Sequence, residues 1–182
     1  MAALTYLFLV MIFGKKKDSK QLTAKRREEF YKILTNSPAG GLDIKWGIGR
    51  VSEKVIDKIN ILAATKLAMI KAVKKLKRKP DFLILDGNFT LPAEALAKAG
   101  IGKAIPQKSI IKADEKVFSC AAASIIAKVT RDRIMRQYHR KYPRYRFDLH
   151  KGYGTKLHFK ILKKCGPCQI HRKTFAPLKR LS

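Results

Sequence analysis

The chain has 182 residues, enough for one domain with a real hydrophobic core, and no break in composition suggests a second domain. Its 41 Lys and Arg residues far outnumber its 13 Asp and Glu residues, and the resulting net charge of +28 favours a polyanionic partner such as nucleic acid. The three cysteines follow no regular spacing, which argues against a disulfide framework and fits a reducing cytoplasm.

Residues 1–13 are almost wholly apolar and are followed by Gly14 and a run of lysines. The apolar run is too short to span a bilayer as a helix, and it lacks the basic start and the Ala-x-Ala site of a secretory signal. Its content of Leu, Val, Ile, Tyr and Phe predicts a buried strand. We therefore expect no membrane partner.

The rest of the chain predicts an alternation of helices and strands. In chain order the expected elements are a helix from Thr23 that residues 36–41 end, a short strand at 46–51, a long helix from Ser52 to about Leu76, a strand at 82–85, a short helix at 93–99, a brief strand at 109–111, a helix around Ala122 that continues toward Tyr142, a turn at 151–155 and a last short helix at 158–164. On the first helix, Phe30, Ile33 and Leu34 share an apolar face.

Most acids are expected to lie on helix faces and to pair with neighbouring Lys and Arg. Two acids are placed differently. Asp86 follows the apolar strand at 82–85, and ligand sites of open α/β sheets form at the carboxyl ends of strands. Asp114 precedes a run of small residues at 121–124, on a helix whose apolar face includes Ala122. Carboxylates placed close together repel one another unless a cation lies between them.

Mg²⁺ suits such a pair because it prefers oxygen ligands and is often held by one or two carboxylates together with substrate phosphates. On a basic protein this arrangement suggests metal-assisted hydrolysis of a phosphodiester, although two purely structural aspartates are the commoner explanation of such spacing alone. Asp132 is the next candidate, but its place within Thr-Arg-Asp-Arg favours an ion pair within the helix.

The segment Cys165-Gly-Pro-Cys168 matches the pattern of a dithiol redox motif. Its position does not fit, because redox chemistry needs this turn to lie between an early strand and a helix. His158 and His171 are near enough in sequence to suggest a zinc site, but the spacings do not match those of a ribbon or a finger. We expect structural cysteines.

Tyr153 lies between two glycines and can present its ring to a nucleotide, since stacking on aromatic rings and contact with the 2′-hydroxyl distinguish RNA. A Gly-Tyr-Gly segment is more often only a turn. Phosphate contacts are expected from Lys20, Lys128, Lys151 and Arg172, although any one cation among so many is more often simply solvated.

The ordered motifs resemble ribonuclease HII, the type 2 ribonuclease H. The blocks that carry the resemblance are Asp-Ser-Lys-Gln-Leu at 18–22, Ile-Asn-Ile-Leu-Ala-Ala-Thr at 59–65, Asp-Gly-Asn at 86–88, Lys-Ala-Asp at 112–114, Ala-Ala-Ala-Ser-Ile-Ile-Ala-Lys-Val-Thr-Arg-Asp at 121–132, His-Lys-Gly-Tyr-Gly-Thr at 150–155, and Gly-Pro-Cys at 166–168 with His-Arg at 171–172. Together they extend over most of residues 10–177 and are far more specific than any single motif.

The resemblance implies an α/β fold with an RNase H-like mixed sheet, flanked by helices and followed by a helical C-terminal extension. It also implies endonucleolytic cleavage of the RNA strand of RNA–DNA hybrids, and of single ribonucleotides embedded in duplex DNA, with Mg²⁺ or Mn²⁺. By motif, Asp86 and Asp114 match two of the family's four metal-binding carboxylates. Tyr153 matches the tyrosine that packs on the sugar at the RNA–DNA junction, and Ser19 and Lys20 match a block near the substrate backbone.

One family block has no counterpart in these 182 residues. The family opens with a strand carrying Asp-Glu-Ala-Gly-Arg-Gly, which supplies the other two carboxylates, whereas residues 1–13 resemble the family's second strand. Because the loss of two ligands weakens metal binding, we expect the polypeptide as written to be an inactive or badly impaired ribonuclease.

The sequence thus predicts a single domain over residues 1–182, with a C-terminal helical part and an irregular tail from about residue 130, acting as a monomer on a hybrid or a ribonucleotide-containing duplex. The alternative is a basic nucleic-acid-binding protein on the same fold without catalytic activity.

Overall fold

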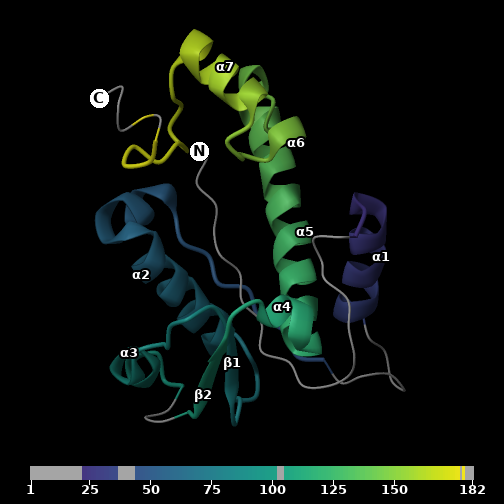
Figure 1. Ribbon diagram of the computed structural model, residues 1–182, viewed down its shortest axis with the longest axis vertical. Helices are drawn as coiled ribbons and strands as arrows, with labels where there is room; N and C mark the ends of the chain where they lie inside the picture. Colours follow the sequence, from purple (N-terminus) through teal and green to yellow (C-terminus); the bar gives the residue numbers. More distant parts are fainter. Residues whose placement is uncertain (1–21, 37–43, 102–104, 177, 179–182) are drawn as a thin grey trace. The chain divides into compact units, whose positions relative to one another are not determined.

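The computed structural model describes residues 22–36, 44–101, 105–176 and 178 and has an α/β fold that is mostly helical with a small parallel sheet (Figure 1). The described residues form two compact units. One contains residues 22–50 and 66–129, and the other contains residues 51–65 and those from 130 onward. The strand predicted at 1–13 lies outside the described residues.

The helices and strands follow the predicted order closely. They are α1 (Ala24–Thr35), α2 (Glu53–Lys74), β1 (Leu83–Asp86), α3 (Ala93–Lys98), β2 (Gln107–Ile110), α4 (Ala113–Lys116), α5 (Phe118–Lys141), the 3-10 helix η2 (Pro143–Tyr145), α6 (Phe147–His150) and α7 (Lys156–Cys165). The short elements α4, η2 and α6 were not predicted, because one turn of helix carries no apolar period that a sequence pattern can detect.

Strands β1 and β2 pair in parallel, with Leu83 opposite Gln107 and Asp86 opposite Ile110. A parallel pair needs a crossover between its strands, and the segment that includes α3 supplies it. Leu83 and Leu85, on one face of β1, are fully buried, whereas Ile84 on the other face is half-buried, so the strand is less covered than the predicted burial of both faces. Phe82 lies before the strand and is exposed. The pairing brings the carboxyl ends of β1 and β2 side by side.

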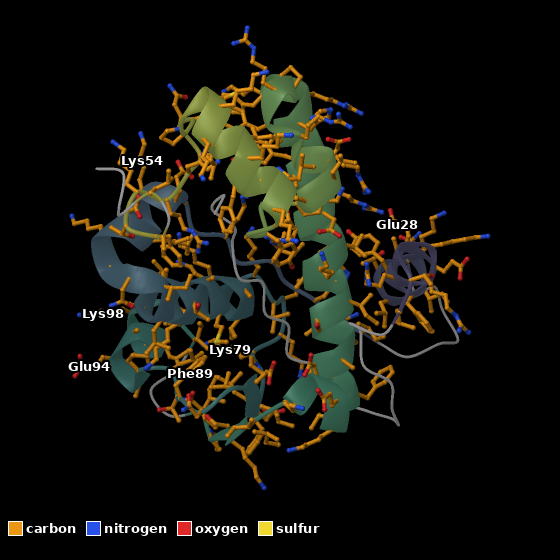
Figure 2. The ribbon with its side chains drawn as sticks, turned by 45° about the horizontal axis from the view of Figure 1, so that its top comes forward. Glu28, Lys54, Lys79, Phe89, Glu94 and Lys98 are labelled. Atoms are coloured by element: carbon orange, nitrogen blue, oxygen red, sulfur yellow. The ribbon has the colours of Figure 1, made fainter. Side chains whose placement is uncertain are left out.

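Helix α3 covers the strands through an apolar cluster that contains Leu83, Leu85 and Leu96. Phe89 packs against the same cluster and is labelled close to α3 in Figure 2. The charged side chains of Glu94 and Lys98 project from α3 away from the strands (Figure 2). Helix α3 is therefore amphipathic, with Leu96 on its buried side.

A second cluster joins α1 to the first half of α5, where Ala122, Ile126 and Val129 are buried as their spacing predicts. Helix α1 begins after Thr23, as predicted, and the Thr23 hydroxyl caps it by accepting a hydrogen bond from the N–H of Arg26. Its predicted apolar face is only partly buried. Leu34 is enclosed, but Phe30 and Ile33 remain exposed, because α1 meets α5 along a narrower stripe than the sequence pattern suggests. 

The strand predicted at 46–51 is wrong, since the structure has irregular chain there. Gly47 and Gly49 lie directly on the backbone of α2, so close that a Cβ atom on Gly49 would fall 1.7 Å from the carbonyl oxygen of Ala68. The segment is thus held by close packing on a helix. Helix α2 itself bends at Asn60, which has a φ of 66° and whose side-chain oxygen accepts a hydrogen bond from the N–H of Ala63.

The unit that contains the C-terminal residues has its own apolar core, made by Met135, Tyr145, Phe147, Leu162, Ile170 and Leu178. Helices α6 and α7 lie beside the C-terminal half of α5 (Figure 1). The rings of Tyr145 and Phe147 stack with centroids 5.5 Å apart, and the Tyr145 hydroxyl donates to the carbonyl oxygen of Gly166 at the end of α7. Among the described residues, no helix combines the length and the apolar character needed to cross a membrane.

We expect Gly49→Ala to lower the free energy of unfolding by about 3 kcal/mol, because the added methyl group cannot fit against α2 without moving backbone. Urea denaturation measures the effect. The matched control is Gly100→Ala, where nothing lies within 4 Å of the added atom and only the positive φ of 74° opposes the change, at a cost of about 1 kcal/mol. Equal losses in the two variants would contradict the close packing at Gly49.

Candidate active site

Asp86 is the last residue of β1 and lies opposite Ile110, the last residue of β2. One of its carboxylate oxygens, Oδ1, accepts a hydrogen bond of 2.9 Å from the backbone N–H of Ala113. Ala113 is the first residue of α4, so this bond ties the end of β1 to the start of the helix that carries Asp114. An exposed N–H at a helix start is a favourable partner for a carboxylate.

Asp114 is only 4% exposed, although it carries an ionisable group. The chain reaches it by a sharp turn after β2, in which Lys112 adopts a left-handed conformation with a φ of 58°. Such a conformation costs a lysine about 1 kcal/mol and persists where the surroundings require it. The turn allows Ala113 to meet Asp86 and places Asp114 inside the unit.

Cys120, in the first turn of α5, is buried against β1. Its thiol is 3.9 Å from the carbonyl oxygen of Ile84 in β1. Burial raises the pKa of the Cys120 thiol to about 11, and the negative charges of Asp86 and Asp114 raise it in the same direction. The charges of both acids therefore influence the same buried thiol.

Of the other site residues predicted in this unit, the structure describes only Lys128. Lys128 is half-buried on α5. Ser19 and Lys20 lie outside the described residues, so their contacts with substrate stay predictions. In the described ranges no group of three or more His, Cys, Asp and Glu side chains could hold a metal ion. Within the described part of the chain, Asp86 and Asp114 are thus a pair of acids without a third titratable ligand beside them.

Asp132 belongs to the other unit and makes the predicted ion pair within α5. Its carboxylate Oδ1 lies 3.9 Å from Nη1 of Arg131, at the outer limit of an ion pair. The guanidinium of Arg131 also lies 4.2 Å from the ring centroid of Tyr153. This contact was not predicted, since it joins residues on α5 and in a distant turn.

Tyr153 occupies the predicted turn between α6 and α7, and its side chain is 47% exposed. The turn is formed by two consecutive left-handed residues, Lys151 with a φ of 48° and Gly152 with a φ of 76°. The ammonium group of Lys151 donates a hydrogen bond to the carbonyl oxygen of Asp148. The tyrosine ring is therefore presented to solvent from a tightly folded turn.

Arg172 lies in the same unit and is buried, with an exposure of 7%. Its guanidinium packs 3.6 Å from the ring centroid of Phe175, and its charge is one of the influences that lower the pKa of Asp57. Arg172 thus has a packing role in the tail, and its contact with a phosphate stays a prediction.

Asp57, on α2, is a residue whose role the sequence did not reveal. Its carboxylate accepts hydrogen bonds from the backbone N–H of Lys173 at 2.9 Å and from the hydroxyl of Thr174 at 2.6 Å. Burial raises the pKa of Asp57, but these hydrogen bonds and the charge of Arg172 outweigh it and hold the pKa below 3.8. The tail predicted as irregular is therefore fixed to α2. A contact between residues 116 positions apart leaves no local signal.

Three of the four histidines are buried together under the Tyr153 turn. His150 stacks on His158 with ring centroids 4.1 Å apart, and Nε2 of His158 lies 3.2 Å from Nε2 of His171. Burial lowers the pKa of all three, to about 4 for His158 and His171. Cys168 joins the group, with its sulfur 3.1 Å from Nδ1 of His171, whereas Cys165 is exposed. Neither of these two thiols forms a disulfide bond, and their structural role stays a prediction.

Comparison with known proteins decides the family. A sequence profile described as Ribonuclease HII matches residues 14–178. A Ribonuclease HII of Chlamydia caviae is 50% identical over 170 residues, which cover 93% of this chain and 73% of that protein. The chain belongs to the ribonuclease HII family. A Ribonuclease HII of Bacillus velezensis is 48% identical over 161 residues, which cover 88% of this chain and 57% of that protein.

The fold agrees with that assignment. A crystal structure of the ribonuclease H2 from Pyrococcus horikoshii OT3 superposes with a TM-score of 0.68 at 29% identity and covers 90% of this chain and 78% of that one. The predicted RNase H-like α/β fold is thereby confirmed, as is membership of a hydrolase family that acts on RNA.

The buried histidines make stability depend on pH. The folded pKa of His158 and of His171, about 4, lies below the ordinary value of 6.5. The stability that these two residues contribute is therefore complete above pH 6.5 and is lost as the pH falls toward 4, because the unfolded chain binds protons there that the folded chain does not. We expect the free energy of unfolding to fall by up to about 1.4 kcal/mol per histidine for each pH unit in this window.

Urea denaturation at a series of pH values between 7 and about 4.5 measures this slope. The control is His158→Asn, which removes one of the titrating groups and should give a shallower slope. A slope that is the same in both proteins would show that His158 does not titrate as its burial requires.

Proposed function

We propose that this chain is an endoribonuclease that cleaves the RNA strand of RNA–DNA hybrids, and single ribonucleotides embedded in duplex DNA, by hydrolysis assisted by Mg²⁺ or Mn²⁺. The supporting observation is that the N–H of Ala113 holds the carboxylate of Asp86 at the carboxyl end of β1, while the next residue, Asp114, is buried. We further propose that the protein acts as a monomer in the cytoplasm.

The donor set fits a hard divalent cation. Asp86 and Asp114 offer carboxylate oxygens, which Mg²⁺ and Mn²⁺ prefer, and Mg²⁺ is commonly held by one or two carboxylates with phosphate oxygens of the substrate. The neighbouring Cys120 does not compete, because its raised pKa keeps the thiol protonated at neutral pH. When bound, the metal would activate water and stabilise the leaving oxygen of the phosphodiester.

The chain's own residues fix the carboxylates and attract the substrate. Asp86 is oriented by the N–H of Ala113, and burial of Asp114 removes the water that would otherwise screen its charge. The net charge of +28 supplies long-range attraction for a nucleic acid, and Lys128 and Lys151 are the proposed phosphate contacts, with Ser19, Lys20 and Arg172 retained from the sequence motif. Tyr153 is proposed to pack on the sugar at the RNA–DNA junction, because the 2′-hydroxyl of that sugar distinguishes RNA from DNA.

We expect Asp114→Asn to weaken binding of Mn²⁺ by at least about tenfold, because it removes a charged oxygen donor. Titration of Mn²⁺ followed by the paramagnetic resonance signal of the free ion measures this affinity without relying on activity. The matched control is Asp81→Asn, which removes an equal charge at an exposed position before β1 and should leave the affinity unchanged. Wild-type affinity in Asp114→Asn would remove Asp114 from the metal site.

Cleavage is tested on three duplexes of one sequence, namely an RNA–DNA hybrid, a DNA duplex with a single ribonucleotide and an all-DNA duplex. Enzyme is used in excess so that a slow rate is measurable. The proposal is supported if the chain nicks at the ribonucleotide only when the metal is present, and if this nicking disappears in Asp114→Asn. If the chain binds all three duplexes alike and cuts none, it is a basic nucleic-acid-binding protein and the catalytic proposal fails.

A further inference from the structure

The hydrogen bonds around His158 fix which nitrogen of each ring carries a proton. His158 Nδ1 lies 2.9 Å from the carbonyl oxygen of Tyr153, which can only accept, so Nδ1 carries the proton. The pKa of about 4 keeps His158 neutral, and its Nε2 must therefore accept the 3.2 Å hydrogen bond from Nε2–H of His171. Nδ1 of His171 then has a free lone pair, and it accepts the backbone N–H of Cys168 at 2.9 Å.

These assignments form one directed chain from Cys168 through His171 and His158 to the carbonyl oxygen of Tyr153. The thiol of Cys168 can donate to the same His171 nitrogen, since the sulfur lies 3.1 Å away. Each link has one donor and one acceptor, so the chain is fully satisfied only when both rings are neutral. A buried network in this state is rigid.

His150 holds the other side of the same turn. Its Nδ1 accepts the N–H of Gly152 at 3.1 Å, and its Nε2–H donates to the carbonyl oxygen of Tyr145 at 2.7 Å. The rings of His150 and His158 stack with an interplanar angle of 11°. The two stacked, buried rings are therefore bonded to the N–H of Gly152, one residue before Tyr153, and to the carbonyl oxygen of Tyr153 itself.

The backbone conformation needs such support. Lys151 and Gly152 are both left-handed, and a left-handed lysine is opposed by about 1–2 kcal/mol. On the solvent side, the half-exposed ring of Tyr153 rests on the guanidinium of Arg131. The direction of the ring is thus set by the backbone bonds below it and by a cation beside it.

We propose that His158 is a positioning residue for Tyr153: its Nδ1–H bond, oriented by His171, aims the tyrosine ring at the sugar that distinguishes a ribonucleotide from a deoxyribonucleotide. The inference rests on the proposed function, in which Tyr153 contacts that sugar. It assigns to the buried histidines a part in selectivity, in addition to their part in the core.

Two substitutions of similar size separate positioning from packing. His158→Asn places an amide N–H near the position of Nδ1, so it can still donate to the Tyr153 carbonyl but loses the bond to His171. His158→Gln places its amide near the position of Nε2, so it keeps a partner in His171 but leaves the Tyr153 carbonyl without its donor. Both remove the ring, and a purely structural histidine should respond to them alike.

The functional readout is the ratio of affinities for a DNA duplex with a single ribonucleotide and for the all-DNA duplex, measured with the full chain by fluorescence anisotropy with Ca²⁺ in place of Mg²⁺ to prevent cleavage. We expect His158→Gln to lower this ratio by about tenfold, which corresponds to roughly 1.4 kcal/mol. His158→Asn should stay within about twofold of the wild type. Equal ratios in the two variants would overturn the inference.

Tyr153→Ala shows which of the two proposals has failed. If it leaves the ratio unchanged, the contact of Tyr153 with the sugar is wrong. If it lowers the ratio whereas His158→Gln does not, Tyr153 contacts the sugar but His158 does not position it. Amide hydrogen exchange gives a readout independent of substrate, since exchange at Gly152 and Thr155 should quicken in His158→Gln and not in His158→Asn.

If neither variant folds, the wild-type protein still decides the matter. Nitrogen NMR of ¹⁵N-labelled histidine should show the proton of His158 on Nδ1, that of His171 on Nε2, and a coupling across the hydrogen bond between the two Nε2 atoms. A proton on Nε2 of His158 would mean that it does not donate to Tyr153, and the inference would be overturned.

Discussion

The hydrogen bond from the N–H of Ala113 to Asp86 is the contact on which the candidate site depends. It joins the end of β1 to the start of α4, and it does so only because β1 and β2 are parallel and end together. The same bond orients the carboxylate of Asp86 and fixes Ala113, the residue just before the buried Asp114. Strand pairing, a left-handed Lys112 and the carboxylate pair are thus parts of one arrangement.

The chain has few acidic residues, and those at the candidate site and beside the tail are held in place by backbone N–H groups as much as by cations. Asp86 accepts a backbone N–H, and Asp57 accepts backbone N–H groups from Lys173 and Thr174. In a chain with a net charge of +28, ion pairs are available everywhere and specify little. Backbone N–H groups are fixed in direction, so they hold a carboxylate in one orientation.

The buried histidines show the opposite use of ionisable groups. His150, His158 and His171 lose their charge in the fold, because burial lowers the pKa of each. A neutral imidazole offers one donor and one acceptor on opposite sides of a ring, which suits it to link backbone groups across a core. These rings connect the Tyr153 turn to the segment at Cys168, so a surface residue and the interior share one hydrogen-bond network.

The sequence by itself determined the order and limits of most helices and strands, the family resemblance and the pair Asp86 and Asp114, because apolar spacing and contiguous motifs are local signals. It failed at 46–51, where Gly49 packs on α2, and on α1, where Ile33 is exposed. Only the tertiary structure decided the meeting of Asp86 with Ala113, the Asp57 bonds to the tail and the tautomers of the histidines. Each joins residues far apart in the chain or depends on burial, and a local pattern records neither.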